Sequence, residues 1–311
     1  MKLLIAALAG LVMLGTSAAA ETLRVGSTKG SANYQTAVTV TKYLQSKGIR
    51  AIPAPHNGQQ QYVTKLNAGK LDMAQGSLGE LTNAYWGRYN HEKTGRKDNL
   101  RLVSRLQCLY TGLIVPVESD IHSYHDLNNV NYPGGFKGRP GLKLLLGAFL
   151  RNAGLGWDDV NEVSVSGIPE SWKLYKTGRT DVALGALGAG SMLPIDAARK
   201  SRWISFDDSP KAVKEFLGDE FIGYEVHRHE PKKAYPLLKE PANLMCVPYY
   251  LYTHVNASED TIYEVAKAMA EATFEGGFMS SFSQKNVADP KNKIPFHKGA
   301  VKAYKELGLM E

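Results

Sequence analysis

Residues 23–44 constrain the fold more than any other part of the chain, because a strand, a loop and a helix follow one another within this one stretch. It opens on apolar residues in alternation, continues through a polar loop of small residues at 26–31, and then becomes amphipathic. Gly48 follows as a helix stop. One helical face carries Ala37, Val38, Thr41 and Leu44. This order of elements predicts an α/β fold.

The loop at 26–31 has the chemistry to bind a small anion or carboxylate. Ser31 or Asn33 can cap the following helix, and Gly30 lets the backbone come close to a ligand above the loop. Thr28 and Lys29 add a hydroxyl and a positive charge to the N–H groups of the helix start. The loop matches neither G-x-x-x-x-G-K-[ST] nor G-x-G-x-x-G, which disfavours a nucleotide. A purely structural strand–loop–helix unit is the alternative.

The first twenty residues read as a secretory signal peptide. Lys2 precedes an apolar run, and Ala18, Ala19 and Ala20 form an A-x-A cleavage site, so a cut is predicted between Ala20 and Glu21. The apolar run is shorter than the ~20 residues that span a bilayer, although an uncleaved anchor is the alternative. We therefore expect a mature protein in the periplasm.

The overall composition is ordinary for a globular protein, with 43% hydrophobic and 22% charged residues. The formal net charge is +7, but the basic residues are scattered among acidic ones, which argues against a nucleic-acid partner and mildly favours anionic ligands. Cys108 and Cys246 permit one disulfide in an oxidising compartment, and two buried thiols are the alternative.

A second strand–helix unit places polar residues at a strand end. The strand at 71–74 runs into Gln75 and Ser77 after a predicted helix at 60–67. Open parallel sheets bind ligands in the crevice at the carboxyl ends of their strands, so Gln75 and Ser77 are candidate contacts. A capping serine and a surface glutamine are the alternative.

The opening unit recurs in the middle of the chain. A strand beginning at Val130 enters a glycine-rich loop containing Gly135, Phe136 and Arg139, and a helix at 142–152 follows. The planar guanidinium of Arg139 suits a carboxylate, with a solvated loop charge as the alternative.

Two similar halves predict two lobes with a cleft between them. Residues 179–191 (RTDVALGALGAGS) repeat the pattern of 70–77 (KLDMAQGS), and each ends a strand in small residues. Two long β-rich runs, 100–117 and 243–254, can carry the chain between the lobes. We expect residues 21–110 with 250–311 to form lobe 1 and residues 111–249 to form lobe 2. Residues 88–99, within the expected lobe 1, read as a polar surface loop.

No catalytic motif is present in the sequence. It contains no H-E-x-x-H and no C-x-x-C, and GIPES at 167–171 lacks the G-x-S-x-G spacing. His227 and His229 could share a strand face and hold a metal, but nothing nearby supplies a third ligand, so we expect a surface pair. The chain is therefore predicted to have no catalytic residues, no metal and no cofactor.

Four stretches together resemble one known family, the TAXI-type solute receptors of tripartite ATP-independent periplasmic (TRAP) transporters. They are VGSTKGSANYQTA, LNAGKLDMAQGSLGE, the crossover LYTGLIVPVESDIHSYHDLNNVNYPGG, and the ending VPYYLYTHVNASEDTIYE with PFHKGAVKAYKELG. The last stretch has Lys298 where the family usually has proline.

The resemblance implies a two-lobed periplasmic binding protein of type II-like architecture. Such a protein has open mixed sheets with flanking helices, a hinge of two strands, and no catalysis. The implied ligand is a small organic anion or amino acid, such as glutamate or 2-oxoglutarate, and the implied partner is a TRAP-type membrane permease. We expect a monomer. An exported enzyme on the same scaffold is the alternative function, and a surface protein without a ligand is a third.

By resemblance, the ligand-binding residues come from loops of both lobes. Thr28, Gly30 and Tyr34 match the family's first loop, and Gln75 and Ser77 match its next strand end. The family's usual serine-glycine-threonine turn in lobe 2 is replaced here by 134–139, which suggests a more acidic or more aromatic ligand. On closure, lobe 2 is expected to contribute Gly135, Phe136, Arg139, Leu187 and Gly188. Cys108 and Cys246, one in each crossover strand, are expected to lie close together and to be open to bridging.

Overall fold

A computed structural model describes residues 22–136, 140–233, 235, 237–274, 277–291 and 293–311. The predicted signal peptide and Arg139 lie outside the described residues. Within the described residues, no helix is both long enough and apolar enough to cross a membrane.

One mixed sheet runs through the molecule in the order β2–β1–β3–β10–β4–β7. β1 pairs in parallel with both β2 and β3, whereas β10 is antiparallel to β3 and to β4. These strands are β1 (Leu23–Thr28), β2 (Ala51–His56), β3 (Met73–Ser77), β4 (Leu100–Pro116), β7 (Ala183–Ala186) and β10 (Ala242–His254).

Two further strands extend this sheet, and two others form a sheet of their own. β8 (Ser201–Trp203) pairs with β4, and β9 (Glu225–His229) pairs with β10. β5 (Asn131–Gly135) and β6 (Asn161–Val165) make a separate parallel pair. The expected strands are confirmed, with β3 beginning two residues later than predicted and running through Gln75 to Ser77.

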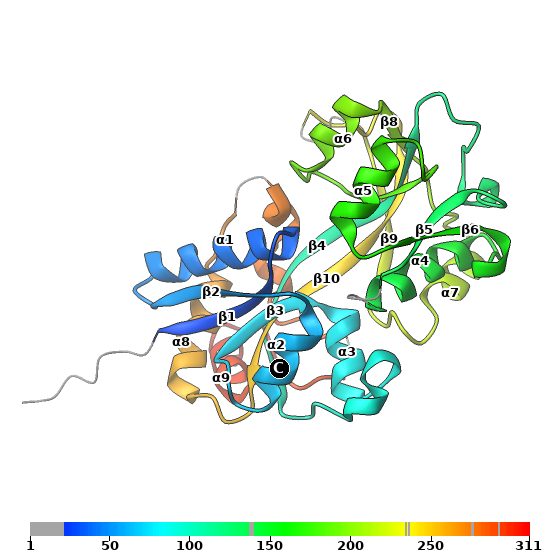
Figure 1. The fold of residues 1–311 in the computed structure, drawn as a ribbon. Coiled ribbons are helices and arrows are strands. Elements are labelled where there is room, and N and C mark those ends of the chain that lie inside the picture. Colours follow the sequence, from blue (N-terminus) through cyan, green and yellow to red (C-terminus); the bar gives the residue numbers. More distant parts are fainter. Residues whose placement is uncertain (1–21, 137–139, 234, 236, 275–276, 292) are drawn as a thin grey trace, which may run out of the picture.

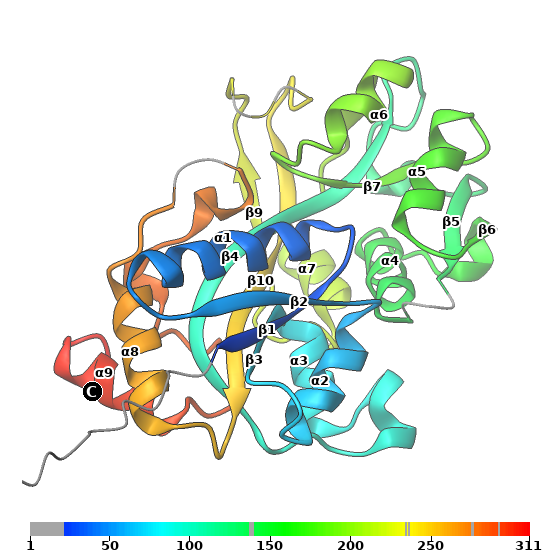
Figure 2. The ribbon, with the colours of Figure 1, turned by 60° about the vertical axis from the view of Figure 1, so that its left-hand side comes forward.

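The helices flank these sheets in two lobes (Figures 1 and 2). Lobe 1 carries α1 (Ala32–Ser46), α2 (Gln59–Asn67), α3 (Leu78–Trp86), α8 (Glu259–Ala270) and α9 (Lys298–Glu306). Lobe 2 carries α4 (Pro140–Asn152), α5 (Ile168–Lys176), α6 (Met192–Ala198) and α7 (Pro210–Leu217). The 3₁₀ helices are η1 (Tyr89–Thr94), η2 (Tyr124–Asp126), η3 (Trp157–Asp159), η4 (Gly277–Ser281) and η5 (Gln284–Asn286).

The two long strands β4 and β10 pass from one lobe into the other (Figure 1). They are paired from Met245 opposite Thr111 to His254 opposite Leu100, with irregular register around residues 248–252. Nearly every residue of both strands is buried, because helices or segments of both lobes cover them. The predicted lobe limits fall inside these two strands, so the limits themselves stay a prediction.

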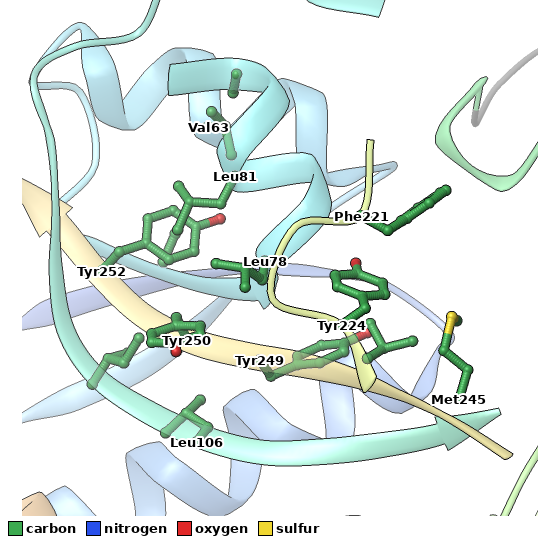
Figure 3. Packing of buried hydrophobic residues seen from close by; sticks show 14 of the residues in the cluster. Val63, Leu78, Leu81, Leu106, Phe221, Tyr224, Met245, Tyr249, Tyr250 and Tyr252 are labelled. Carbon is green, nitrogen blue, oxygen red and sulfur yellow. The ribbon is translucent and has the colours of Figure 1, made fainter. Parts of the chain in front are cut away.

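One segment assigned to lobe 2 packs against lobe 1 instead. Tyr224 lies beside Leu78 of α3 (Figure 3), and Phe221 lies near Gly79 of the same helix. The backbone N–H of Gly79 donates to the Tyr224 hydroxyl at 3.0 Å. Burial raises the pKa of Tyr224 above its ordinary value. Aromatic side chains thus draw this stretch from α7 across to α3 before the chain enters β9.

The expectation of a polar surface loop at 88–99 holds for most of this segment, in which seven of the twelve residues are exposed. The segment contains η1, in which the His91 side chain is 0% exposed, and Lys97 is buried as well. The Lys97 ammonium donates to the carbonyl oxygens of Thr94 and Gly95 at 2.6 and 2.7 Å. These two side chains find partners inside the fold, so their polarity in the sequence did not indicate their exposure.

The pair His227 and His229 is half-buried on β9 and is not a plain surface pair. His227 contacts the Glu225 carboxylate at 3.0 Å, and the His229 ring lies 4.1 Å from the Tyr110 ring, centroid to centroid. Burial, followed by the nearby charge of His227, lowers the pKa of His229 to about 4. Among the described residues, no group of three or more His, Cys, Asp or Glu side chains could hold a metal ion.

A disulfide joins Cys108 of β4 to Cys246 of β10, with their Cα atoms 5.1 Å apart. It cross-links the two strands that connect the lobes. Because 138 residues separate the two cysteines along the chain, the bond closes a large loop in the unfolded protein.

We expect removal of this disulfide to lower the free energy of unfolding by about 2–5 kcal/mol. The comparison is urea unfolding of the wild type and of Cys108→Ser/Cys246→Ser. A reductant should destabilise the wild type and leave the double variant unchanged. Thiol titration of the unfolded, unreduced wild type should find no free thiol, and two free thiols would refute the bond.

We expect His229 to make stability decline in acid. Its pKa is about 4 in the folded protein and about 6.5 in a free chain, so its contribution is complete above pH 6.5 and is lost as pH falls toward 4. The free energy of unfolding of His229→Gln, measured in urea between pH 7 and 4, should therefore fall less steeply than that of the wild type. Parallel curves for the two proteins would contradict this.

Candidate functional site: the cavity between the lobes

A cavity of about 690 Å³ lies between the lobes. Its size falls within the range of small-molecule sites, which is roughly 300–1,000 Å³. Lobe 1, lobe 2 and the crossover strands all contribute to its lining, the strands through Leu109, Thr111, Val247 and Tyr249. A solute held there would contact both lobes at once.

The wall from lobe 1 is polar. It consists of the loop from β1 to α1, the start of α2, the end of β3, and parts of α3 and η1. These elements present hydroxyl, amide and charged groups because they are strand ends and helix starts, where backbone groups and capping side chains collect. The polar side chains are Thr28, Lys29, Ser31, Asn33, Asn57, Gln59, Gln60, Ser77, Glu80, Asn83 and Asn90.

The loop from β1 to α1 is shaped by its own hydrogen bonds. The Ser31 hydroxyl donates to the Thr28 carbonyl oxygen at 2.7 Å and makes no side-chain cap on α1. The Asn33 side-chain oxygen accepts from the Thr28 N–H at 2.5 Å, so neither residue caps the helix as expected. Gly30 has φ +63°, which few other residues adopt readily. Residues 28–33 all line the cavity.

Gln75 is correctly placed at the strand end but points away from the cavity lining. It is fully buried, and its side-chain nitrogen donates to the Asn33 carbonyl oxygen at 2.7 Å. The Tyr62 hydroxyl donates to the Gln75 carbonyl oxygen at 3.0 Å. The prediction that Gln75 faces the cleft is therefore wrong, because its amide is used to hold the first loop against β3.

Ser77 does line the cavity, together with Gln59 of α2. The Ser77 N–H and hydroxyl both lie within hydrogen-bond distance of the Gln59 side-chain oxygen, at 3.1 and 3.2 Å. The Gln59 side-chain nitrogen donates to the Ser77 carbonyl oxygen at 3.1 Å. These contacts fix the end of β3 against the start of α2.

The described part of the wall from lobe 2 is largely apolar, and the expected contact of Arg139 lies outside the described residues. Its side chains come mainly from α4, α5 and β7. Trp172 of α5 is half-buried, and its indole N–H donates to the Leu184 carbonyl oxygen at 2.9 Å. Apolar members of this wall are Leu142, Leu144, Leu145, Ile168, Pro169, Trp172, Leu184 and Ala186.

Several predicted contacts lie elsewhere. Phe136 is fully buried in the core of lobe 2, where the hydrophobic effect favours its aromatic ring. Its N–H donates to the Val165 carbonyl oxygen. Gly135 precedes it and lies outside the cavity lining, as does Tyr34 of α1. Leu187 and Gly188 line a separate cavity of about 100 Å³. The chain turns away from the cleft after Ala186, whose neighbour Leu187 donates to the Tyr110 carbonyl oxygen.

A corner of the cavity that sequence reasoning missed contains Glu80. Its carboxylate accepts from the Asn90 side-chain nitrogen at 3.1 Å on both oxygens and contacts Nε2 of His91 at 2.7 Å. Asn83, one helical turn on, also lines the cavity. The sequence did contain a signal for Glu80. It comes three residues after Ser77, in the first turn of the helix that follows β3, the strand whose end lines the cavity.

Lobe 2 approaches this corner at the start of α4. Gly141 lines the cavity, and a Cβ atom at that position would lie 3.2 Å from Oε2 of Glu80. Lys29 and Glu80 are the charged residues among the described lining. The site therefore has one positive and one negative side chain on its polar wall and an apolar wall opposite.

Residues 26–308 match the model of the NMT1-like family, which is most of the chain. The chain belongs to the NMT1-like family. Solved structures with similar folds accompany this match. The sulfonate-binding protein SsuA of Methylobacillus flagellatus KT, described as putative and as part of an ABC transporter, is 15% identical over 93% of this chain and 95% of its own, with a TM-score of 0.53.

A second structure similar to this NMT1-like chain is PhnD1 from Prochlorococcus marinus (MIT 9301), solved with methylphosphonate. It is 12% identical over 93% of this chain and 99% of its own, with a TM-score of 0.51. Likeness at such low identity concerns the fold, and the fold is the two-lobed, type II-like α/β architecture of periplasmic binding proteins.

In this NMT1-like protein we expect Asn33→Ala to lower the free energy of unfolding by about 2 kcal/mol. The substitution leaves the buried Thr28 N–H and Gln75 side-chain oxygen without the partner they now share. Urea unfolding is the measurement. Gln35→Ala, on the exposed side of the same helix, is the control and should change stability by less than about 0.5 kcal/mol. Equal effects of the two substitutions would contradict the role given to Asn33.

Proposed function

We propose that this protein is a periplasmic solute receptor. It captures a small organic anion or amino acid in the cavity between its lobes and delivers it to a membrane permease. The observation that carries the proposal is the cavity of about 690 Å³ lined by both lobes and by the strands that join them. Binding proteins of this architecture close around a ligand by moving one lobe against the other.

The polar wall supplies the contacts that orient the solute. Lys29 and the N-terminus of α1 favour a carboxylate, because both carry positive charge and residues 29–33 line the cavity. The apolar wall opposite removes the rest of the solute from water, and closure strengthens every polar contact by excluding solvent. Micromolar affinity needs roughly −8 kcal/mol, within reach of one charge-assisted contact, several hydrogen bonds and apolar burial.

A binding role is favoured over the exported-enzyme alternative by the chemistry of the lining. General acid–base catalysis needs titratable groups within reach of the substrate, usually as a pair. In the described lining, Glu80 is the one carboxylate and its partner His91 is fully buried behind it. Proteins with similar folds carry the names of binding proteins, SsuA for sulfonate among them.

The resemblance of four stretches to TAXI receptors supports a TRAP-type permease as the partner. SsuA, by contrast, is described as part of an ABC transporter. A TRAP permease would drive uptake with an ion gradient and an ABC transporter with ATP, so the energy source of solute uptake separates the two partners.

The receptor function predicts a ligand-dependent shift in melting temperature. In a screen of amino acids, carboxylates, dicarboxylates, sulfonates and phosphonates, one class should raise the melting temperature by several degrees, since saturation at 100 Kd adds about 2.7 kcal/mol. Trp172→Ala should reduce this shift, because the side chain lines the cavity.

Trp86→Ala is the matched control, since that half-buried tryptophan lies outside the cavity lining and packs with Arg96. It should leave the ligand-induced shift unchanged. The proposal would be overturned if no class shifted the wild type, or if Trp172→Ala kept the full shift.

A further inference from the structure

The corner of the cavity around Glu80 is rich in hydrogen-bond acceptors. The Glu80 side chain is 12% exposed and lines the cavity. The neutral side-chain amide of Asn90 donates to both carboxylate oxygens, and one ring nitrogen of His91 contacts the carboxylate. Among the described residues, no lysine or arginine lies within ion-pair distance of this carboxylate.

His91 is the buried ring that contacts the Glu80 carboxylate. Its ring is 0% exposed, Nε2 faces Glu80 at 2.7 Å, and Nδ1 has no hydrogen-bond partner among the described residues. A proton on Nε2 satisfies the carboxylate, whereas a second ring proton on Nδ1 would be buried without an acceptor. The ring therefore presents one nitrogen, Nε2, to the Glu80 carboxylate.

Two amide oxygens add further hydrogen-bond acceptors to this corner. Asn83 is 4% exposed, lines the cavity, and its side-chain oxygen has no partner among the described residues. The side-chain oxygen of Asn90 is likewise buried without a partner. Its orientation follows from chemistry, because a carboxylate only accepts, so the Asn90 nitrogen must face Glu80. Buried acceptors need a donor, and at the wall of a cavity a solute can supply one.

We propose that Glu80, Asn83 and Asn90 form a subsite for a primary ammonium group of the solute. An ammonium has three N–H donors and one positive charge, which match the carboxylate and the two unsatisfied amide oxygens. The apolar wall of α4 and α5 then takes an aliphatic or aromatic body. The inference rests on the proposed receptor function and narrows its ligand to an amine-bearing solute with an apolar part.

This subsite disfavours dicarboxylates such as 2-oxoglutarate. A second carboxylate placed in the corner would face Glu80 and the amide oxygens, which is a like-charge contact without donors. The start of α4, where Gly141 comes close to Oε2 of Glu80, brings lobe 2 over the same corner. The ammonium would thus be held where the two lobes meet.

The test compares matched solutes by calorimetric titration of the full-length mature protein. Leucine and phenylalanine carry both groups, 4-methylpentanoate and 3-phenylpropanoate lack the amine, and 3-methylbutylamine and 2-phenylethylamine lack the carboxylate. We expect at least one amine-bearing member to bind ten-fold or more tightly than its amine-free partner, which corresponds to about 1.4 kcal/mol. The third pair decides whether the solute is a zwitterion or a simple amine.

Glu80→Gln should weaken binding of the amine-bearing solute at least ten-fold and leave the affinity for its amine-free partner unchanged. Asn83→Ala, which keeps the Glu80 contacts, should weaken the amine-bearing solute three-fold or more. Glu92→Gln, an exposed substitution in η1, is the matched control and should bind as the wild type does. Melting curves check that each variant is folded.

The outcomes separate the two proposals. If wild-type protein binds dicarboxylates or amine-free acids as tightly as amines, or if both Glu80→Gln and Asn83→Ala keep full affinity for the amine, the ammonium subsite is refuted and the receptor function stands. If no solute of any class binds the wild type, both proposals fail.

Discussion

The pairing of β4 with β10 is the interaction on which the rest of the structure depends. Both strands cross between the lobes, so each lobe is built onto the same sheet and not onto a loose linker. The disulfide between Cys108 and Cys246 cross-links them. Their register becomes irregular near Pro248, a residue that has no N–H for the ladder, and such irregularities bend a strand pair. The position of the bend sets how the two walls of the cavity face each other.

Both lobes turn strand ends and helix starts toward the cavity, and the two walls differ in the side chains that these parts carry. Lobe 1 turns strand ends and helix starts toward it, and these carry free N–H groups and short polar side chains. Lobe 2 presents the first turns of α4 and α5 and the end of β7, and the side chains that it presents there are mainly apolar. Burying apolar surface stabilises a complex by about 25 cal/mol per Å², so the lobe 2 wall contributes to the affinity for a solute. It does not fix the orientation of the solute, because this contribution is non-directional. Direction comes from lobe 1, where donors and acceptors have fixed positions.

The sequence predicted the elements well and the site only in part. Periodicity located α1, α4 and both crossover strands because each has a repeating apolar face that depends on nearby residues alone. Thr28, Gly30, Asn33 and Ser77 do lie at the cavity, since strand ends in a parallel sheet share one edge. Phe136, Leu187 and Gln75 do not, because their direction depends on contacts with distant elements. His91 shows the same limit, since its burial depends on Glu80 eleven residues earlier.

The last constraint is the carboxylate of Glu80, which lies at the wall of the cavity and is only partly exposed to solvent. A carboxylate in water is stabilised by solvent, and it loses that stabilisation when a lobe covers it. Asn90 and His91 restore part of it through three hydrogen bonds, and the start of α4 lies close by. A glycine at 141 is what allows that approach, since a Cβ there would stand 3.2 Å from the carboxylate oxygen. This arrangement places one partly desolvated charge at the meeting point of the lobes, where a solute of opposite charge would add most to holding them together.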